Sequence, residues 1–417
     1  MRTNRTLMRS RWSILATARM LMLALACLGA PKALAQDTPH VEVYGFVQAD
    51  YTQDFDRVDP AWEDALRPSK IPTTEGQFGD DGQASISAKQ SRLGVLMNFP
   101  TSNKPVYTKF EFDMFGVGVD EGQTTIRLRH AYGQWGQWLA GQTNTLFMDA
   151  SIFPNVVEYW GPAGMVFIRN PQIRWTPFQG DNSLAFAIER PGNDVDPGQI
   201  RIFDPTLGDD ITSTQKLPDF TAQFRSEHGW GHFQVAGVVR SIGFETLGTE
   251  DNEPSDDELG WGVDLTGSWK FFEKDKLLGG VVYGEGIAQY MNDGGTDMAA
   301  DLDSLGNPEA TAVPLLGVSL YWDHWWSDRF SSSFGYSMDT VDNTDLQTDD
   351  AFYKGEYASA NLIYYPTQNV FMAGELLWGR REDNGGNDGE DKRIQISFHY
   401  SFSTKDIFKK NPKESLQ

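Results

Sequence analysis

The chain has 417 residues and a formal net charge of −23 at pH 7, and 13% of its residues are aromatic. The acidic balance argues against a nucleic-acid partner, because phosphate binding needs a basic surface, and the aromatic content is too high for a disordered chain. Beyond the N-terminus the sequence has no run of about 18 apolar residues, which excludes a helical membrane protein.

Residues 1–35 are predicted to be a cleavable signal peptide. Arginines precede an apolar run at residues 21–30, and residues 33–35 (ALA) place small side chains at the −3 and −1 positions of a cleavage site. The exported chain would begin at Gln36 and would contain no cysteine, because Cys27 is the only one in the sequence. A lipoprotein signal that uses Cys27 is the alternative.

From Val41 onward, apolar residues recur at every second position in segments of about ten residues. The clearest segment is 393–402 (RIQISFHYSF), in which aliphatic and aromatic residues alternate with polar ones. Successive side chains of a strand point to opposite faces, so each segment is predicted to be a strand with one apolar and one polar surface.

The connectors between these segments alternate in length. Short turns are predicted at 100–105, 134–137, 177–182, 227–231, 272–276, 324–328 and 366–369. Long polar links are predicted at 53–83, 116–123, 148–166, 192–215, 242–260, 291–312, 341–352 and 383–391. Short turns at one end and long loops at the other are typical of an outer-membrane barrel.

We therefore predict an all-β fold, a transmembrane antiparallel β-barrel of about 16 strands in the Gram-negative outer membrane. The barrel domain would span residues 36–403, with short periplasmic turns, long external loops and a short basic periplasmic tail at 404–417. Outer-membrane lipid and lipopolysaccharide would surround it. A soluble β-sandwich also alternates, but aromatic residues such as Trp138 and Trp322 end the apolar faces, as in membrane-interface girdles.

The third long link differs from the others because it is apolar and aromatic (residues 148–167, MDASIFPNVVEYWGPAGMVF). An apolar loop is unfavourable in water, so this loop is predicted to fold inward and pack inside the barrel. It would form a constriction loop, with Arg169 at its exit. The residues expected near the narrowest point are Asp149, Glu158, Tyr159 and Trp160.

Several arginines have the parity of the polar, pore-facing side. These are Arg92, Arg127, Arg129, Arg174, Arg225 and Arg240. Guanidinium groups are permanently charged and bind carboxylates bidentately, so rings of them attract and orient anions. The alternative is that they pair with wall carboxylates and only brace the pore. The acidic residues at 250–258 and 382–391 are expected at loop tips, where salt screens their field.

The run 126–149 (IRLRHAYGQWGQWLAGQTNTLFMD), followed by WGP at 160–162 and RNPQIRW at 169–175, resembles the DcaP-like family of trimeric outer-membrane porins. The resemblance implies a 16-stranded homotrimer that passes small anions, typically dicarboxylates. The arginine-lined path that it implies falls on Arg92, Arg127, Arg129, Arg169 and Arg174. Some members carry a periplasmic coiled coil before the barrel, whereas here only residues 36–40 are expected between the signal peptide and the first strand. The sequence also continues past Phe402 with a basic tail, where a terminal aromatic residue would be expected.

An enzyme is not expected, because nucleophilic catalysis needs a base within hydrogen-bond reach of a nucleophile. His228, His232 and His324 fall in predicted turns, His399 stands alone, and His130 has lipid-face parity, which suggests a subunit interface. We find no metal-binding set and expect no cofactor. The predicted function is an anion porin; the alternatives are a non-selective general porin and a barrel that serves as a structural or adhesive anchor.

Overall fold

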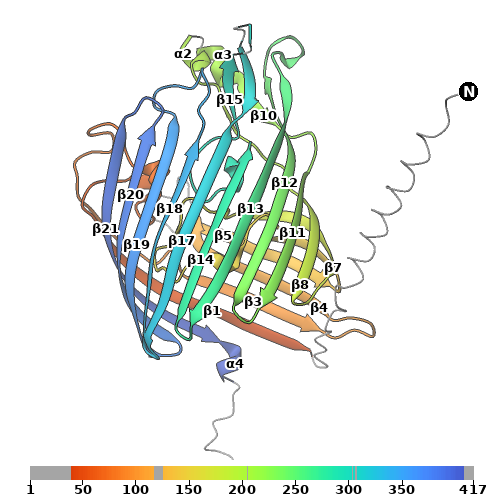
Figure 1. The fold of residues 1–417 in the computed structure, drawn as a ribbon, viewed down its shortest axis with the longest axis vertical. Coiled ribbons are helices and arrows are strands. Elements are labelled where there is room, and N and C mark those ends of the chain that lie inside the picture. Colours follow the sequence, from red (N-terminus) through yellow and green to blue (C-terminus); the bar gives the residue numbers. More distant parts are fainter. Residues whose placement is uncertain (1–38, 117–124, 204, 303, 306–307, 408–417) are drawn as a thin grey trace, which may run out of the picture.

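The computed structural model describes residues 39–116, 125–203, 205–302, 304–305 and 308–407. The predicted signal peptide, the centre of the second long link and the end of the basic tail lie outside these residues. The described chain forms a closed antiparallel β-barrel of 16 strands, as predicted (Figure 1). Within the described residues no helix is long and apolar enough to cross a membrane.

The wall is built from consecutive strands. In order they are β1 (His40–Asp54), β2 (Gln83–Ser87), β3 (Arg92–Phe99), β4 (Val106–Gly116), β5 (Thr125–Trp135), β6 (Trp138–Asn144), β7 (Arg169–Phe178), β8 (Asn182–Glu189), β10 (Ile211–Thr214), β11 (Asp219–His228), β12 (Gly231–Thr246), β13 (Asp256–Phe272), β14 (Asp275–Glu285), β17 (Pro314–Ser327), β18 (Phe330–Val341), β19 (Phe352–Thr367), β20 (Val370–Asp383) and β21 (Asp388–Ser403). β2 and β3 both pair with β1 and together act as one wall strand. β10 likewise continues β11 along β12. The pairing of β1 with β21 closes the barrel and removes free sheet edges.

The long links carry the remaining elements. They are η1 (Pro60–Trp62), η2 (Pro68–Lys70), η3 (Ala150–Ile152), β9 (Val195–Asp196), α2 (Ile200–Phe203), α3 (Pro205–Asp210), η4 (Glu250–Asn252), η5 (Ala288–Tyr290), β15 (Met298–Leu302) and β16 (Pro308–Ala312), and α4 (Thr404–Ile407) follows the last strand. β9, β15 and β16 form a small separate sheet at the long-loop end of the barrel (Figure 1). Short turns and long loops lie at opposite ends, as predicted.

Two long loops are shorter than predicted, because the flanking strands continue through acidic residues. The loop between β12 and β13 is only 247–255, and the loop between β20 and β21 is only 384–387. Many of the acidic residues expected at loop tips therefore lie in strands. Cross-strand ion pairs support this extension: Arg380 on β20 contacts Asp388 on β21 at 3.1 Å and Glu356 on β19 at 3.2 Å.

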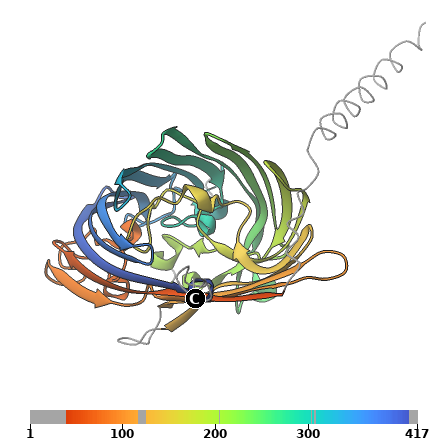
Figure 2. The same ribbon diagram turned by 90° about the horizontal axis from the view of Figure 1, so that it is seen from below.

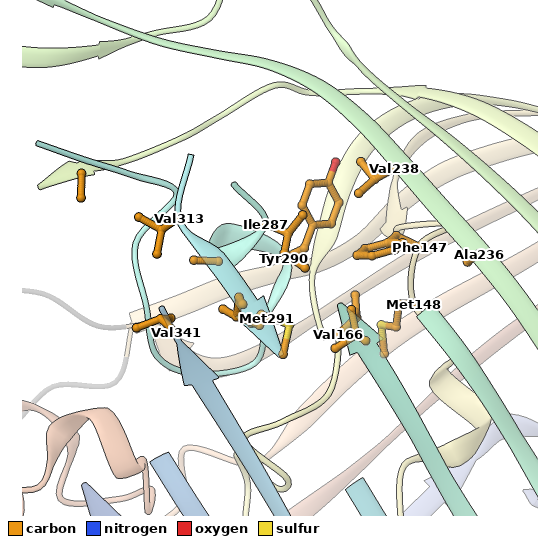
Figure 3. Close-up of a cluster of buried hydrophobic side chains, with 14 residues drawn as sticks. Phe147, Met148, Val166, Ala236, Val238, Ile287, Tyr290, Met291, Val313 and Val341 are labelled. Atoms are coloured by element: carbon orange, nitrogen blue, oxygen red, sulfur yellow. The ribbon is translucent and has the colours of Figure 1, made fainter. Parts of the chain in front are cut away.

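The third loop, residues 145–168, runs through the interior of the barrel, as predicted (Figure 2). Its Phe147 and Val166 are buried against Ile287 and Met291 of the sixth loop (Figure 3). Its Ile152, Ala163 and Met165 belong to a second cluster, together with first-loop and wall residues. Burial of these apolar side chains offsets the loss of freedom of a long loop.

A close backbone approach fixes where this loop lies. A Cβ atom on Gly164 would stand 1.9 Å from the carbonyl oxygen of Met338 on β18 and 2.5 Å from that of Val318 on β17. Only glycine therefore allows the loop to lie flat against these two strands.

Candidate pore constriction

The third loop narrows the barrel to a cavity of about 480 Å³. Wall strands line one side of this cavity and the loop lines the other. The charged lining residues are Arg92 of β3, Lys109 and Glu111 of β4, Arg127 and Arg129 of β5, and Arg169 at the start of β7. The third loop contributes Glu158, Tyr159 and Trp160, and β5 also contributes His130.

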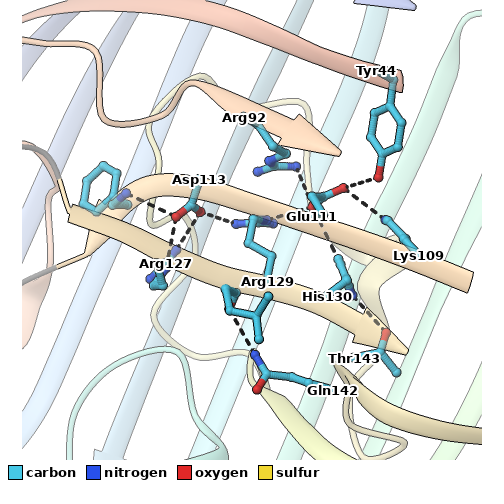
Figure 4. Close-up of polar contacts among 12 residues, drawn as sticks. Tyr44, Arg92, Lys109, Glu111, Asp113, Arg127, Arg129, His130, Gln142 and Thr143 are labelled. Carbon is cyan, nitrogen blue, oxygen red and sulfur yellow. Dashed lines mark hydrogen bonds and ion pairs between the residues drawn. The ribbon is translucent and has the colours of Figure 1, made fainter. Parts of the chain in front are cut away.

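Two carboxylates on β4 organise the arginines (Figure 4). Arg129 bridges them, because its Nε lies 2.9 Å from Glu111 Oε1 and its Nη1 lies 2.8 Å from Asp113 Oδ2. Arg127 binds Asp113 through Nε at 3.2 Å and Nη2 at 3.0 Å. Lys109 Nζ and the Tyr44 hydroxyl contact the other oxygen of Glu111 at 3.1 and 2.7 Å. These charge-assisted bonds hold the guanidinium planes in fixed orientations.

A β-bulge on β5 places two consecutive residues, Arg129 and His130, on the pore side. Glu111 pairs with His130, but the next residue of β4, Phe112, pairs with Leu128, so Arg129 is the extra residue. The bulge breaks the two-residue period. As a result His130 faces inward beside Arg129, with its Nδ1 3.0 Å from Thr143 Oγ1. The prediction of a lipid-facing His130 in a subunit interface is therefore wrong.

Arg169 and Arg92 are the least neutralised cations of the cavity. Arg169 makes no ion pair with any described residue, and its guanidinium lies 5.1 Å from the centre of the Phe167 ring. The nearest carboxylate contact of Arg92 is Nη1 to Glu111 Oε1 at 3.7 Å, and its guanidinium lies 5.1 Å from the Phe46 ring centre. Aromatic faces thus stabilise both cations without cancelling their charge.

Glu158 is the third carboxyl group at the cavity, and backbone donors hold its two oxygens. Its Oε1 accepts a hydrogen bond from Leu66 N at 3.0 Å, and its Oε2 accepts one from Gly161 N at 2.7 Å. Burial raises the pKa of Glu158 despite these bonds. Five basic side chains (Arg92, Lys109, Arg127, Arg129 and Arg169) face three carboxyl groups (Glu111, Asp113 and Glu158), which leaves an excess of positive charge.

Two further third-loop residues close the cavity. The Tyr159 hydroxyl donates to Asp113 Oδ2 at 2.7 Å, and its ring stacks on Phe115 with centres 3.7 Å apart. The Trp160 Nε1 donates to the backbone oxygen of Asn292 in the sixth loop at 2.7 Å. The loop is therefore attached to both the arginine wall and the opposite loop.

Asp149 lies outside the cavity and anchors the start of the third loop. Its Oδ1 lies 2.9 Å from Arg225 Nη1 on β11, and its Oδ2 lies 2.6 Å from His232 Nε2 on β12. Burial alone would raise the pKa of Asp149, but the hydrogen bonds from His232 and Ser151 and the charge of Arg225 outweigh it and lower the pKa.

The predicted pore-lining arginines separate into two groups. Arg92, Arg127, Arg129 and Arg169 converge on the cavity. Arg174 instead donates to Gln172 Oε1 at 2.8 Å and to the Asn144 backbone oxygen at 2.7 Å. Arg225 anchors Asp149, as described above. Arg240 is 2% exposed and ion-paired with Asp219 at 3.2 Å and Asp297 at 2.8 Å, so it does not line the cavity.

Sequence reasoning missed Tyr44, Lys109 and His130 at this site. Lys109 shares its parity with Glu111 and Asp113, and Tyr44 lies on the polar face of the first strand, so both could have been proposed from the sequence. His130 could not, because the bulge reverses its parity.

The sequence profile of the DcaP outer membrane protein family matches residues 28–402. The chain belongs to the DcaP outer membrane protein family. The crystal structure of the outer membrane channel DcaP of Acinetobacter baumannii matches with a TM-score of 0.74 and 23% identity, covering 90% of this chain and 100% of that one. OmpT of Vibrio cholerae, in its trimer form, matches with a TM-score of 0.54 and 10% identity over 88% of this chain and 100% of that one.

At these identities the structural matches establish the barrel fold. Among curated proteins, none matches the chain. The family and the fold are those of outer-membrane porin channels, which are not enzymes. The resemblance seen in the sequence is thus confirmed for family and fold.

Proposed function

We propose that this DcaP-family protein is a porin that admits small organic anions, dicarboxylates in particular, through the arginine-lined constriction. The observation that carries the proposal is the excess of cationic groups over carboxylates in the cavity, with Arg169 bound to no acidic group among the described residues. Rings of such groups are one way in which pores select anions.

The net charge of the chain does not oppose this function. In a narrow, partly desolvated cavity a charge at about 4 Å contributes a few kcal/mol, against about 1 kcal/mol in bulk water. Acidic groups in the loops act over a Debye length of roughly 8 Å at physiological salt. Local wall charges therefore determine the potential at the constriction. Arg92 and Arg169 come from different wall strands, so a dicarboxylate has two incompletely neutralised partners.

Reversal potential across a salt gradient tests this function. In planar bilayers we expect anion preference for the native protein and weaker preference for Arg169→Ala, because that substitution removes a charge without exposing an acidic partner. Arg201→Ala, which alters an exposed arginine of the fourth loop, is the matched control and should leave the potential unchanged. Cation preference in the native protein would refute the proposal, and absence of steady open current would favour an anchor role.

We also propose a homotrimer that associates through the low part of the wall, β3 to β8 (Figure 1). β6 and β8 have seven and eight residues, fewer than the about 9–11 that a tilted strand needs to cross a bilayer. A neighbouring subunit would shelter this wall, whose outer face exposes Ile126, Leu128 and Ile173. A solved relative of this fold occurs in a trimer form.

The trimer proposal predicts the effect of charge on the outer wall. Ile173→Arg on the low wall should convert a heat-sensitive trimer band on a mild gel into monomer. Leu320→Arg, on the tall wall at β17, exposes the same charge to lipid and should leave the trimer intact. Both residues are outward-facing and more than half exposed in the isolated chain. Native protein that stays monomeric in gentle detergent would contradict the proposal.

We propose that export uses a signal peptide of residues 1–35. Amino-terminal sequencing of the protein from outer membranes should then begin at Gln36. A processed chain that begins at Cys27 would instead support the lipoprotein alternative.

A further inference from the structure

A second cavity, of about 580 Å³, lies on the long-loop side of the constriction. It is bounded by the first, third, fourth and sixth loops and by the long-loop ends of β19 and β20. Trp160, Phe167 and Asn292 line both this outer cavity and the constriction, so these residues form the partition between the two. A solute that enters from the long-loop end and crosses this partition reaches the arginine cluster.

The partition is held by contacts among three loops. The Trp62 and Trp160 rings meet edge to face with centres 5.0 Å apart, and the guanidinium of Arg67 lies 4.2 Å from each ring centre. Arg67 Nη2 contacts Asp293 Oδ1 at 2.8 Å. The Asn292 side-chain amide donates to the backbone oxygen of Trp160 at 2.9 Å. These contacts hold the wall between the outer cavity and the constriction in a defined position.

Two of the three lining cations of the outer cavity are ion-paired within the protein. Asp293 binds Arg67, whereas Asp194 makes no ion pair with a described residue and accepts a hydrogen bond from Asp297 N at 2.7 Å. Arg381 contacts Asp383 at 2.6 Å and donates to the Ser69 backbone oxygen at 3.0 Å. Arg67 and Arg381 therefore offer little unbalanced positive charge to a ligand.

Lys70 is the exception among the lining cations of this cavity. Within the described residues its ammonium makes no ion pair or hydrogen bond, although it is half-buried in the lining. Burial, followed by the nearby charge of Arg67, lowers the pKa of Lys70. The charges of Asp293 and Asp59 oppose this shift only in part, and neither carboxylate contacts the ammonium directly. A half-buried ammonium without a direct partner is unfavourable, and a ligand carboxylate would supply the contact.

We propose that Lys70 and the outer cavity form a capture subsite that binds a carboxylate solute before it passes the Trp160 partition to the constriction. This inference rests on the proposed anion-porin function. The subsite and the arginine cluster would be two successive anion-binding sites on one permeation path. The unpaired charge of Lys70 raises the local concentration of anions at the long-loop entrance and thereby the rate at which they reach the constriction.

The test measures current block by succinate, added to one side of a bilayer that holds oriented channels. For Lys70→Ala, the rate of block from the long-loop side should fall about three- to tenfold, while the rate from the short-turn side stays within about twofold of native. Lys70→Arg keeps the charge and should keep the native rate. Lys392→Ala, which removes an exposed charge at the same end outside this cavity, should behave like the native protein.

The outcomes separate this inference from the function on which it rests. If the native channel prefers anions and succinate blocks the Lys70→Ala channel at the native rate from both sides, the capture subsite is overturned and the porin function stands. An equal loss from both sides also overturns the subsite, because it places Lys70 in the common constriction. If Lys70→Ala lacks the native heat-sensitive trimer band, Lys70→Arg and Lys70→Gln replace it in the test. A native rate of block for Lys70→Arg and a reduced rate from the long-loop side for Lys70→Gln support the proposal. Equal rates for these two variants overturn it.

Discussion

At the scale of single residues, the constriction is a set of cations held by a smaller number of carboxylates. Asp113 contacts Arg127 at 3.0 Å, Arg129 at 2.8 Å and the Tyr159 hydroxyl at 2.7 Å. Its negative charge both orients the arginines and weakens their field. Each wall carboxylate therefore fixes the orientation of the arginines and at the same time lowers the anion preference of the pore.

This balance predicts that Asp113→Asn makes the pore more anion-selective. The substitution removes a negative charge from beside two guanidinium groups and leaves their positive charges in place. It should also lower stability, because a buried ion pair that loses one partner costs about 3–5 kcal/mol. Reversal potential and the temperature of trimer-band loss measure the two effects. An unchanged reversal potential, or a shift toward cation preference, would contradict this prediction.

At the scale of elements, the third loop decides the shape of the channel. Its ends and its tip are attached to different parts of the wall: Asp149 to β11 and β12, and the backbone N–H groups of Val157 and Glu158 to Glu375 on β20 at 2.9 and 2.6 Å. Apolar burial holds the segments between these points. The loop is thus a fixed part of the pore wall.

The anchor at Asp149 predicts a pH dependence of stability. Its folded pKa lies below the unfolded value of about 3.9, so the folded state binds fewer protons in that region. The stabilisation is fully present above the unfolded pKa and is lost as the pH falls through the lowered folded pKa. Asp149→Asn should therefore lower the unfolding temperature at pH 7, and the difference from native protein should shrink near pH 2.

Heat-induced loss of barrel migration on gels, after incubation at each pH, measures this difference. Asp209→Asn, an exposed carboxylate in the fourth loop, is the control that should not change the profile. A difference between native protein and Asp149→Asn that is independent of pH would contradict the electrostatic account of the anchor.

At the scale of the whole molecule, the barrel was predictable because closure imposes a simple rule on the sequence. Each strand alternates between lipid and interior, and turn lengths differ between the two ends, so period and spacing identified the 16 strands and the inward third loop. Parity also selected Arg92, Arg127 and Arg129 as interior residues. Parity could not show at what height along a strand each arginine lies or which loop covers it. Arg240 was therefore predicted to line the pore, although it is buried in an ion-pair network outside the cavity.

Two other features lay beyond the sequence pattern. The bulge at Arg129 adds one residue to a strand and reverses the parity of His130, and nothing in the local composition marks it. The strand extensions through residues 256–258 and 388–391 depend on cross-strand partners, which are known only once register is fixed. The sequence therefore predicted which residues face inward better than it predicted their neighbours.

The central claim is that the arginines of the constriction, rather than the net charge of −23, set ion preference. The most direct measurement is the reversal potential across a salt gradient for native protein and for Arg127→Ala combined with Arg129→Ala. The double substitution removes both guanidinium partners of Asp113 and the Arg129 partner of Glu111, but Arg92, Lys109 and Arg169 remain in the lining. We therefore expect anion preference in the native channel and a clearly weaker anion preference in the variant. Cation preference in the native channel, or the same potential for both proteins, would contradict the claim.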